Sequence, residues 1–114
     1  MISHNAFMAI LKELQSREGE VLDKRAELYS TDYNRTHNFE AIGNRVNMKP
    51  PVVALILAYK HLVALEDWLL NYNRQKYDTV DASDFKQVEE WIIDIRNYLA
   101  FIYAMLYENI EYDN

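Results

Sequence analysis

PVVALILAYKHLVALEDWLL, residues Pro51 to Leu70, and VEEWIIDIRNYLAFIYAML, residues Val88 to Leu106, decide the fold of this chain. Both stretches are apolar enough to form buried helices, but each carries polar residues where a core helix should have none. These residues are Lys60, His61, Glu66 and Asp67 in the first stretch, and Glu89, Glu90, Asp94, Arg96 and Asn97 in the second. Charged side chains are rarely fully buried unless they are paired or bind a metal ion. The pattern therefore indicates either a polar site inside a helical bundle or a solvated edge.

The second stretch belongs to the most regular helical pattern in the chain. Its apolar residues alternate spacings of three and four, as in a heptad seam: Phe85, Val88, Ile92, Ile95, Leu99, Ile102 and Leu106. Trp91, Tyr98 and Met105 widen this stripe, so we expect it to pack against more than one neighbouring helix. We expect Asp81 or Ser83 to cap the helix.

Three further helical segments are expected earlier in the chain. Their predicted bounds are Ser3, as N-cap, to about Tyr29; about His37 to Arg45; and a helix opened by Pro50-Pro51 that ends near Tyr72. Gly19 is expected to split or bend the first of them, and STDYNRT (30–36) is expected to be a loop. No strand-like alternation is present. We therefore predict one all-α domain, 1–114, folded as a bundle of four or five helices.

Composition excludes several classes of function. The formal net charge is −6, which argues against a protein that binds duplex nucleic acid, because such proteins need a dominant basic face. The chain has no cysteine, so disulfides and thiolate metal sites are excluded. Pro51–Leu70 is the only stretch near membrane-spanning length, and its four ionisable residues make a lipid-facing span costly. The N-terminal residues lack the features of a signal peptide, so we expect a cytosolic protein with no membrane partner.

Helical geometry places several of the polar residues on common faces. Lys60 and Asp67 share a face of the first stretch, and Glu90, Asp94 and Asn97 share a face of the second. If the two helices pack antiparallel, Asp67 and Asp94 are expected to approach each other, and they would repel unless a cation lay between them. Lys60 is one candidate for that cation, and Mg²⁺, which prefers carboxylate oxygens, is another. The competing interpretation is a solvated stripe of charges.

Most catalytic templates are absent from the sequence. There is no cysteine nucleophile, Gly-rich phosphate loop, HExxH or GxSxG, and the three histidines do not have the spacing of a zinc site. We interpret His61 as a packed or capping histidine, and His37 and Asn38 as part of a helix start. Any chemistry would therefore rest on carboxylates and a metal ion.

Three segments, taken in order, resemble a known group of proteins. NRTHNF (34–39) is similar to the DRxHNF element of small phage and prophage proteins associated with nucleotide modification. AYKHLVALEDWL (58–69) resembles their AKHxVSxxD helix at Lys60, His61, Val63 and Asp67, and EWIIDIRNYL (90–99) resembles their final helix at Asp94, Asn97 and Tyr98. The resemblance covers roughly residues 25–107.

That group is similar to the all-α nucleoside triphosphate pyrophosphohydrolases of the MazG-like and dimeric dUTPase-like superfamily. The resemblance implies an all-α fold, Mg²⁺ held by helix carboxylates, cleavage between the α- and β-phosphates by a metal-activated water, and assembly as a dimer or tetramer. Asp94, with Glu90 one turn before it, matches the acidic residues of the family's ExxD element. The EExxE element of the family has no counterpart in this chain. A hydrolase and a protein that binds nucleotides without turnover both fit the sequence.

We therefore expect a phage- or prophage-type protein that binds, or binds and hydrolyses, a nucleotide or modified nucleotide through Mg²⁺ in a cleft between helices. The expected catalytic residues are Asp67 and Asp94, the expected Mg²⁺ ligands are Asp67, Asp94 and Glu90, and the expected substrate contacts are Lys60, Asn97, His37 and Asn38. The alternative is a non-enzymatic helical interaction protein that forms a homo-oligomer and uses Lys60–Asp67 and Asp94 as structural ion pairs. Its nine tyrosines suit such an interface.

Overall fold

A computed structural model describes residues 1–29 and 35–112, with side chains for all of these except 27–29. The chain forms four helices: α1 (His4–Tyr29), α2 (His37–Val46), α3 (Pro50–Asn73) and α4 (Ala82–Glu108). No strand occurs in the described ranges, so the predicted all-α class is confirmed, with a number of helices inside the predicted range. Most of the expected loop, residues 30–34, lies outside the described residues.

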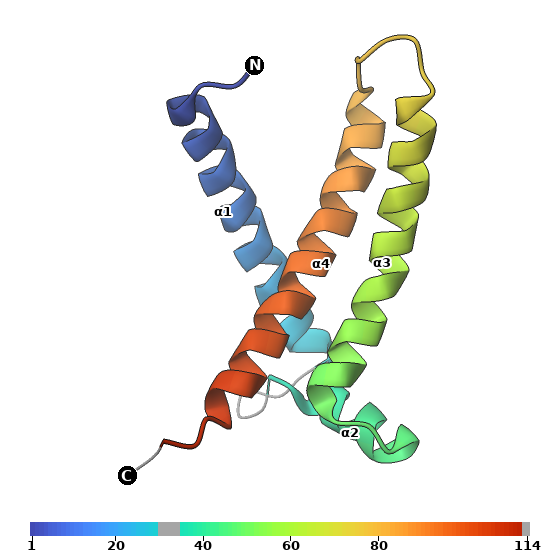
Figure 1. Cartoon of the computed structure of the whole chain (residues 1–114). Helices are drawn as coiled ribbons and strands as arrows, with labels where there is room; N and C mark the ends of the chain where they lie inside the picture. Colours follow the sequence, from blue (N-terminus) through green and yellow to red (C-terminus); the bar gives the residue numbers. More distant parts are fainter. Residues whose placement is uncertain (30–34, 113–114) are drawn as a thin grey trace.

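The centre of the molecule is an antiparallel hairpin of α3 and α4 (Figure 1). α1 crosses α4, and α2 lies where α3 begins (Figure 1). The core cluster joins α2, α3 and α4 through Phe39, Val53, Ala54 and Met105. Ala54 is completely buried and Ala58 is buried one turn later. Such small side chains let neighbouring helices approach closely, so they set the spacing of the core.

Local sequence signals account for where the helices begin and end. The Asp81 carboxylate caps α4 by accepting a hydrogen bond from the backbone N–H of Ser83 at 2.7 Å, as one of the two predicted caps should. Pro50 and Pro51 occupy the first turn of α3, where a missing N–H does no harm. α2 ends at Asn47, which adopts a left-handed conformation with φ of 56°, and asparagine tolerates this better than most residues.

α1 continues through Gly19 without interruption, so the prediction that this glycine splits the helix was wrong. A single glycine in a helix interior costs only about 1 kcal/mol relative to alanine. The regular apolar and polar pattern on both sides of Gly19 outweighs that cost.

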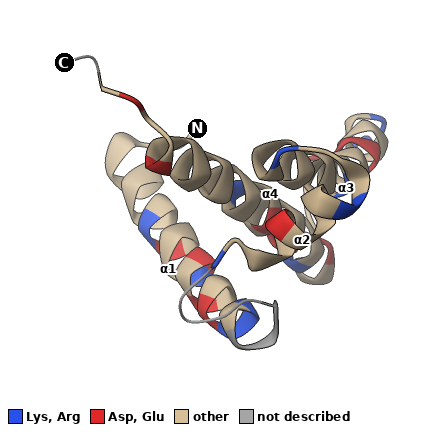
Figure 2. Ribbon diagram, turned by 90° about the horizontal axis from the view of Figure 1, so that it is seen from below, with Lys and Arg blue, Asp and Glu red and all other residues tan. Residues whose placement is uncertain are grey.

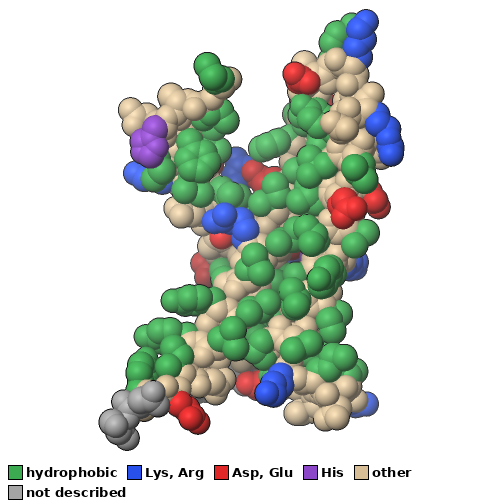
Figure 3. All heavy atoms as spheres, viewed as in Figure 1, with side chains coloured by type: hydrophobic (Ala, Val, Ile, Leu, Met, Phe, Trp, Pro, Cys, Tyr) green, Lys and Arg blue, Asp and Glu red, His purple; other side chains and the backbone are tan. Residues whose placement is uncertain are grey.

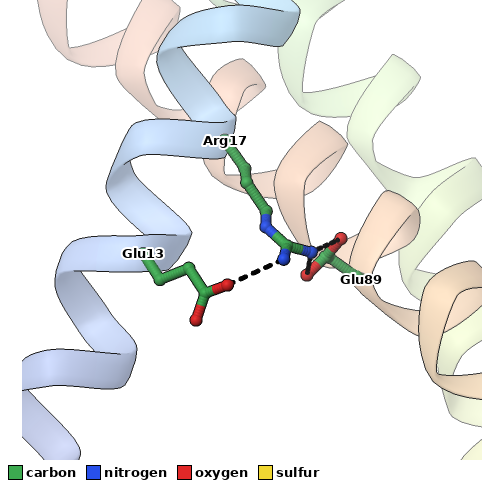
Figure 4. Close-up of polar contacts among 3 residues, drawn as sticks. All are labelled: Glu13, Arg17 and Glu89. Atoms are coloured by element: carbon green, nitrogen blue, oxygen red, sulfur yellow. Dashed lines mark hydrogen bonds and ion pairs between the residues drawn. The ribbon is translucent and has the colours of Figure 1, made fainter. Parts of the chain in front are cut away.

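Ion pairs link α1 to α4. The Arg17 guanidinium binds Glu89 of α4 at 2.6 Å and Glu13 of its own helix at 2.8 Å (Figure 4). These carboxylates raise the pKa of Arg17, with the Glu89 hydrogen bond as the main cause. Two turns along α4 from Glu89, Arg96 pairs with Glu18, the residue next to Arg17 on α1. Figure 2 shows the basic and acidic positions following one another along α1. This attachment should weaken in salt, because exposed pairs are screened.

The heptad seam of α4 is only partly covered. Val88 is buried, but Phe85, Leu99 and Leu106 remain more than half exposed. The seam does meet more than one neighbour, because both α3 and α1 pack on α4. None of the helices within the described ranges has both the length and the apolar content needed to cross a membrane.

Two glycines in helix interiors provide a matched test of this packing. A Cβ at Gly43 would lie 2.5 Å from the backbone oxygen of Met48, whereas a Cβ at Gly19 would meet nothing within 4 Å. We expect Gly43→Ala to lower the free energy of unfolding by about 1–3 kcal/mol, because the chain after α2 must move. Gly19→Ala should raise it by about 0.5–1 kcal/mol. Urea unfolding followed by circular dichroism measures both, and equal effects of the two changes would contradict the close approach at Gly43.

Candidate functional site

A cavity of about 420 Å³ is lined by residues from three of the helices, α1, α3 and α4, and from the segment that leads into and begins α2. This volume falls in the range of small-molecule sites. Its lining is Leu22, Arg25 and Ala26 from α1; Arg35, Asn38 and Phe39; His61 from α3; and Asp94, Asn97, Tyr98 and Phe101 from α4. The wall combines charged, amide and aromatic groups, as expected of a site that orients a polar ligand.

Asp94 is the centre of the polar part of the wall. The residue is 7% exposed, and a buried carboxylate needs partners. Arg25 Nη2 lies 2.7 Å from one carboxylate oxygen and His61 Nδ1 lies 3.5 Å from the other. α1 and α3 therefore meet at a single residue of α4.

The side chain of Asn97 is the least satisfied group in the cavity wall. Asn97 is 4% exposed, and neither its amide nitrogen nor its amide oxygen has a hydrogen-bond partner among the described residues. Leaving a buried polar group unpaired costs about 1–3 kcal/mol, and native proteins rarely do so without a functional reason. A carboxamide offers a donor and an acceptor side by side, so a ligand that satisfies both must present the complementary pair.

Aromatic rings form the apolar part of the wall. The Phe39 ring packs edge-on against Tyr98 and Phe101, with ring centroids 6.1 and 5.2 Å away. The Tyr98 ring also stacks on His61 at 5.8 Å, which fixes the imidazole beside Asp94. Burial raises the pKa of the Tyr98 hydroxyl; Arg25 opposes this shift and Asp94 adds to it. The hydroxyl is therefore a neutral hydrogen-bond donor at physiological pH.

The charges of the lining do not cancel. Among the described lining residues, Arg25 and Arg35 bring two positive charges and Asp94 one negative charge, so these side chains favour an anion. Arg35 uses one guanidinium nitrogen to donate to the backbone oxygen of Leu22 at 3.1 Å. Both arginines are exposed. They can therefore meet a ligand group that reaches the mouth of the cavity.

The structure brings together three of the seven residues that the sequence nominated. Asp94, Asn97 and Asn38 line the cavity. Lys60, Asp67, Glu90 and His37 are exposed and do not belong to its wall. The predicted approach of Asp67 to Asp94 is therefore not seen.

The antiparallel hairpin explains why Asp67 and Asp94 are apart. Residues equally distant from the α3–α4 connection lie level with each other, which sets His61, not Asp67, beside Asp94. Lys60 precedes His61 by one residue and so points about 100° away from it. Neither Lys60 nor Asp67 forms an ion pair within the described part of the chain.

Sequence reasoning missed Arg25 and undervalued His61. His61 was interpreted as a packed or capping histidine, whereas it faces Asp94. His61 and Asp94 are about equally distant from the α3–α4 connection, and this spacing could have identified His61 as a neighbour of Asp94. Arg25 is far from Asp94 in sequence and lies on a helix whose crossing point the pattern does not specify. No local signal marks it.

The described residues contain no group of three or more histidine, aspartate or glutamate side chains placed to hold a metal ion. Among the described residues, Asp94 is the single carboxylate of the cavity wall. It is already paired with Arg25. These residues alone therefore do not form a dedicated Mg²⁺ site, and Mg²⁺ stays a prediction from the sequence.

No family model, curated protein or solved structure was found to match this chain.

Replacing Asn97 tests whether its amide is kept for a ligand. Asn97→Leu keeps the branched shape with two larger methyl groups, for which the cavity leaves room, and has no unpaired polar atoms, so we expect the free energy of unfolding to rise by about 1–2 kcal/mol. Asn44→Leu on the exposed surface of α2 is the control, and it should change stability by less than about 0.5 kcal/mol. Thermal and urea unfolding at equal protein concentration give both values. Destabilisation by Asn97→Leu would show that the amide is satisfied in solution.

Proposed function

We propose that this protein binds a nucleotide in the cavity between its helices. The observation that carries the proposal is the unpaired, buried amide of Asn97 in a wall that also holds aromatic rings and an excess of positive charge. A nucleotide supplies a counterpart to each of these three features. The proposal keeps the ligand class expected from the sequence but changes the residues that would contact it.

The base would occupy the aromatic side of the cavity. Nucleobases stack on aromatic side chains, with a contribution of about 1–3 kcal/mol per base, and Phe39, Tyr98 and Phe101 supply such rings. The edge of a base carries a hydrogen-bond donor next to an acceptor, and an asparagine amide is a known complement of such an edge. Asn97 would read that edge, with Asn38 as a second polar contact in the same wall.

The phosphates would meet the arginines at the mouth of the cavity. A guanidinium binds phosphate oxygens through paired hydrogen bonds, which lysine cannot reproduce. Arg25 is 46% exposed at its side chain while it pairs with Asp94, so the pairing does not bury it. Arg35 adds a second guanidinium to the lining.

Mg²⁺ would enter with the phosphates. Mg²⁺ commonly takes one or two protein carboxylates and completes its shell with phosphate oxygens and water. Asp94 is the carboxylate of the described lining that would contact the ion, and its pairing with Arg25 leaves most of the coordination to phosphate oxygens and water. Glu90 and Asp67 lie outside the cavity. Hydrolysis stays a prediction from the resemblance, because the roles assigned here to Asn97, Arg25 and the rings are roles in binding.

Titration calorimetry with nucleoside mono- and triphosphates, with and without Mg²⁺, tests the proposal. We expect binding by the wild-type protein, and a loss of about tenfold to a hundredfold in affinity for Arg25→Gln, because a charge-assisted hydrogen bond is worth about 1.5–3 kcal/mol. Arg25→Lys keeps the charge but loses the planar guanidinium, so its affinity should lie between those of the wild type and Arg25→Gln.

Arg17→Gln is the matched control for this experiment. Arg17 also ties α1 to a glutamate of α4, but it lies outside the cavity, so its loss should leave the affinity within about twofold of wild type. Absence of binding by any nucleotide at millimolar concentration, with circular dichroism showing a folded protein, would contradict the proposed function. Equal losses for the Arg17 and Arg25 variants would show that α1 attachment, not phosphate contact, controls binding.

A further inference from the structure

The chain exposes far more surface than a compact protein of its mass. Its accessible surface is 9450 Å², whereas a compact monomer of 13.6 kDa exposes about 6,600 Å². The radius of gyration is 17.1 Å, against about 13 Å for a compact chain of this length. The excess of about 2,900 Å² exceeds the roughly 800 Å² that each partner buries in a standard complex. It reaches the range of obligate dimers.

The outer face of α3 exposes many apolar side chains. We define that face by eight apolar residues that are 44–54% exposed: Val52, Leu55, Ile56, Tyr59, Leu62, Val63, Leu69 and Leu70. They lie on the side of the helix opposite to the buried Val53 and Ala54. α3 therefore carries apolar residues on both sides, with Glu66 lying among those of the outer face, and a helix that is apolar on both sides is typically covered by protein on both sides. In the space-filling view, hydrophobic side chains extend over α3 and α4 (Figure 3).

We propose that the outer face of α3 packs against the same face of a second copy of this chain, with the two α3 helices antiparallel. A second copy is favoured because the excess surface of the whole chain is as large as an obligate interface, and because an exposed apolar helix face resembles the domain core cut in half that obligate interfaces present. Two-fold homodimers are the commonest soluble assemblies. The net charge of −6 disfavours an anionic lipid surface as the occupant, because surface-binding helices are basic.

The charges beside this face select the antiparallel arrangement. Lys60 and Asp67 lie two helical turns apart on one flank of the outer face, and both are exposed. A two-fold axis passing beside Val63 sets Lys60 of one copy opposite the partner's Asp67, and the pair occurs twice. A parallel arrangement would instead set Asp67 beside the partner's Glu66, two like charges at close range. The dimer therefore gives a role to the two residues that the cavity leaves out.

Sedimentation equilibrium at micromolar concentration tests the interface. The wild-type chain should be a dimer, and Val63→Lys, at a side chain that is 54% exposed, should weaken self-association by about a hundredfold, because central interface positions dominate binding. Tyr112→Lys is the control: Tyr112 is 76% exposed and lies after α4, and it should leave the dimer intact. A wild-type monomer with full helical content would overturn the proposal.

A cross-linking experiment covers the case in which the Val63 variant fails to fold. The chain has no cysteine, so single cysteines at Leu55, Tyr59, Leu62 or Val63 report on the two-fold axis. At least one of them should form a disulfide-linked dimer under mild oxidation, whereas Lys24→Cys on α1 should not. The assignment of the interface to α3 would be overturned by three results together. The dimer would persist in Val63→Lys, none of these cysteines would cross-link it, and Leu99→Lys would dissociate it.

A charge swap tests the antiparallel register. Lys60→Asp and Asp67→Lys should each weaken the dimer by about tenfold, and the double variant should restore it, because two like-charge contacts become ion pairs again. Lys60→Asp combined with Glu66→Lys is the matched control, and this double variant should not recover the dimer affinity of the wild type. Restoration by Glu66→Lys in place of Asp67→Lys would overturn the register. None of these outcomes depends on whether the cavity binds a nucleotide.

Discussion

Close packing of α3 on α4 is the constraint from which the rest of this structure follows. The small, buried side chains of Ala54 and Ala58 let the two helices approach, and the short connection after α3 fixes which residues are level. That register sets His61 beside Asp94. Asp94 in turn gives Arg25 of α1 a partner, so the position of a third helix depends on the register of the first two. A change in the connection would therefore disturb the cavity without touching its walls.

Two polar residues of the cavity wall lower the stability of the fold. Asp94 and Asn97 are the two buried polar residues of α4 among an otherwise apolar set, and the Asn97 amide has no described partner. Leucine at these two positions would give a simpler core helix. Residues that are poor for folding yet lie together in one cavity are typical of functional sites. The presence of both residues in one wall is the main reason to interpret the cavity as a site and not as a packing defect.

Sequence periodicity was sufficient for the helices but not for their contacts. The apolar spacing, the prolines and Asp81 predict α3 and α4 nearly to the residue, because helix formation depends on neighbours in sequence. Asp94 and Asn97 could be found because they interrupt an apolar stripe. Arg25 could not, because its role depends on where α1 crosses α4. Lys60 and Asp67 were misplaced for the same reason: the sequence shows that they share a face, but not which neighbour that face meets.

The attachment of α1 has a consequence for the dynamics of the cavity. The first ten residues of the chain are all exposed, no residue of α1 with a described side chain is fully buried, and arginine–carboxylate pairs link α1 to α4. Segments with little apolar burial open at low free energy, independently of the core. If α1 separated from α4, Arg25 would leave Asp94 and one wall of the cavity would be lost. A ligand bound to Arg25 would therefore also stabilise the packing of α1 against α4.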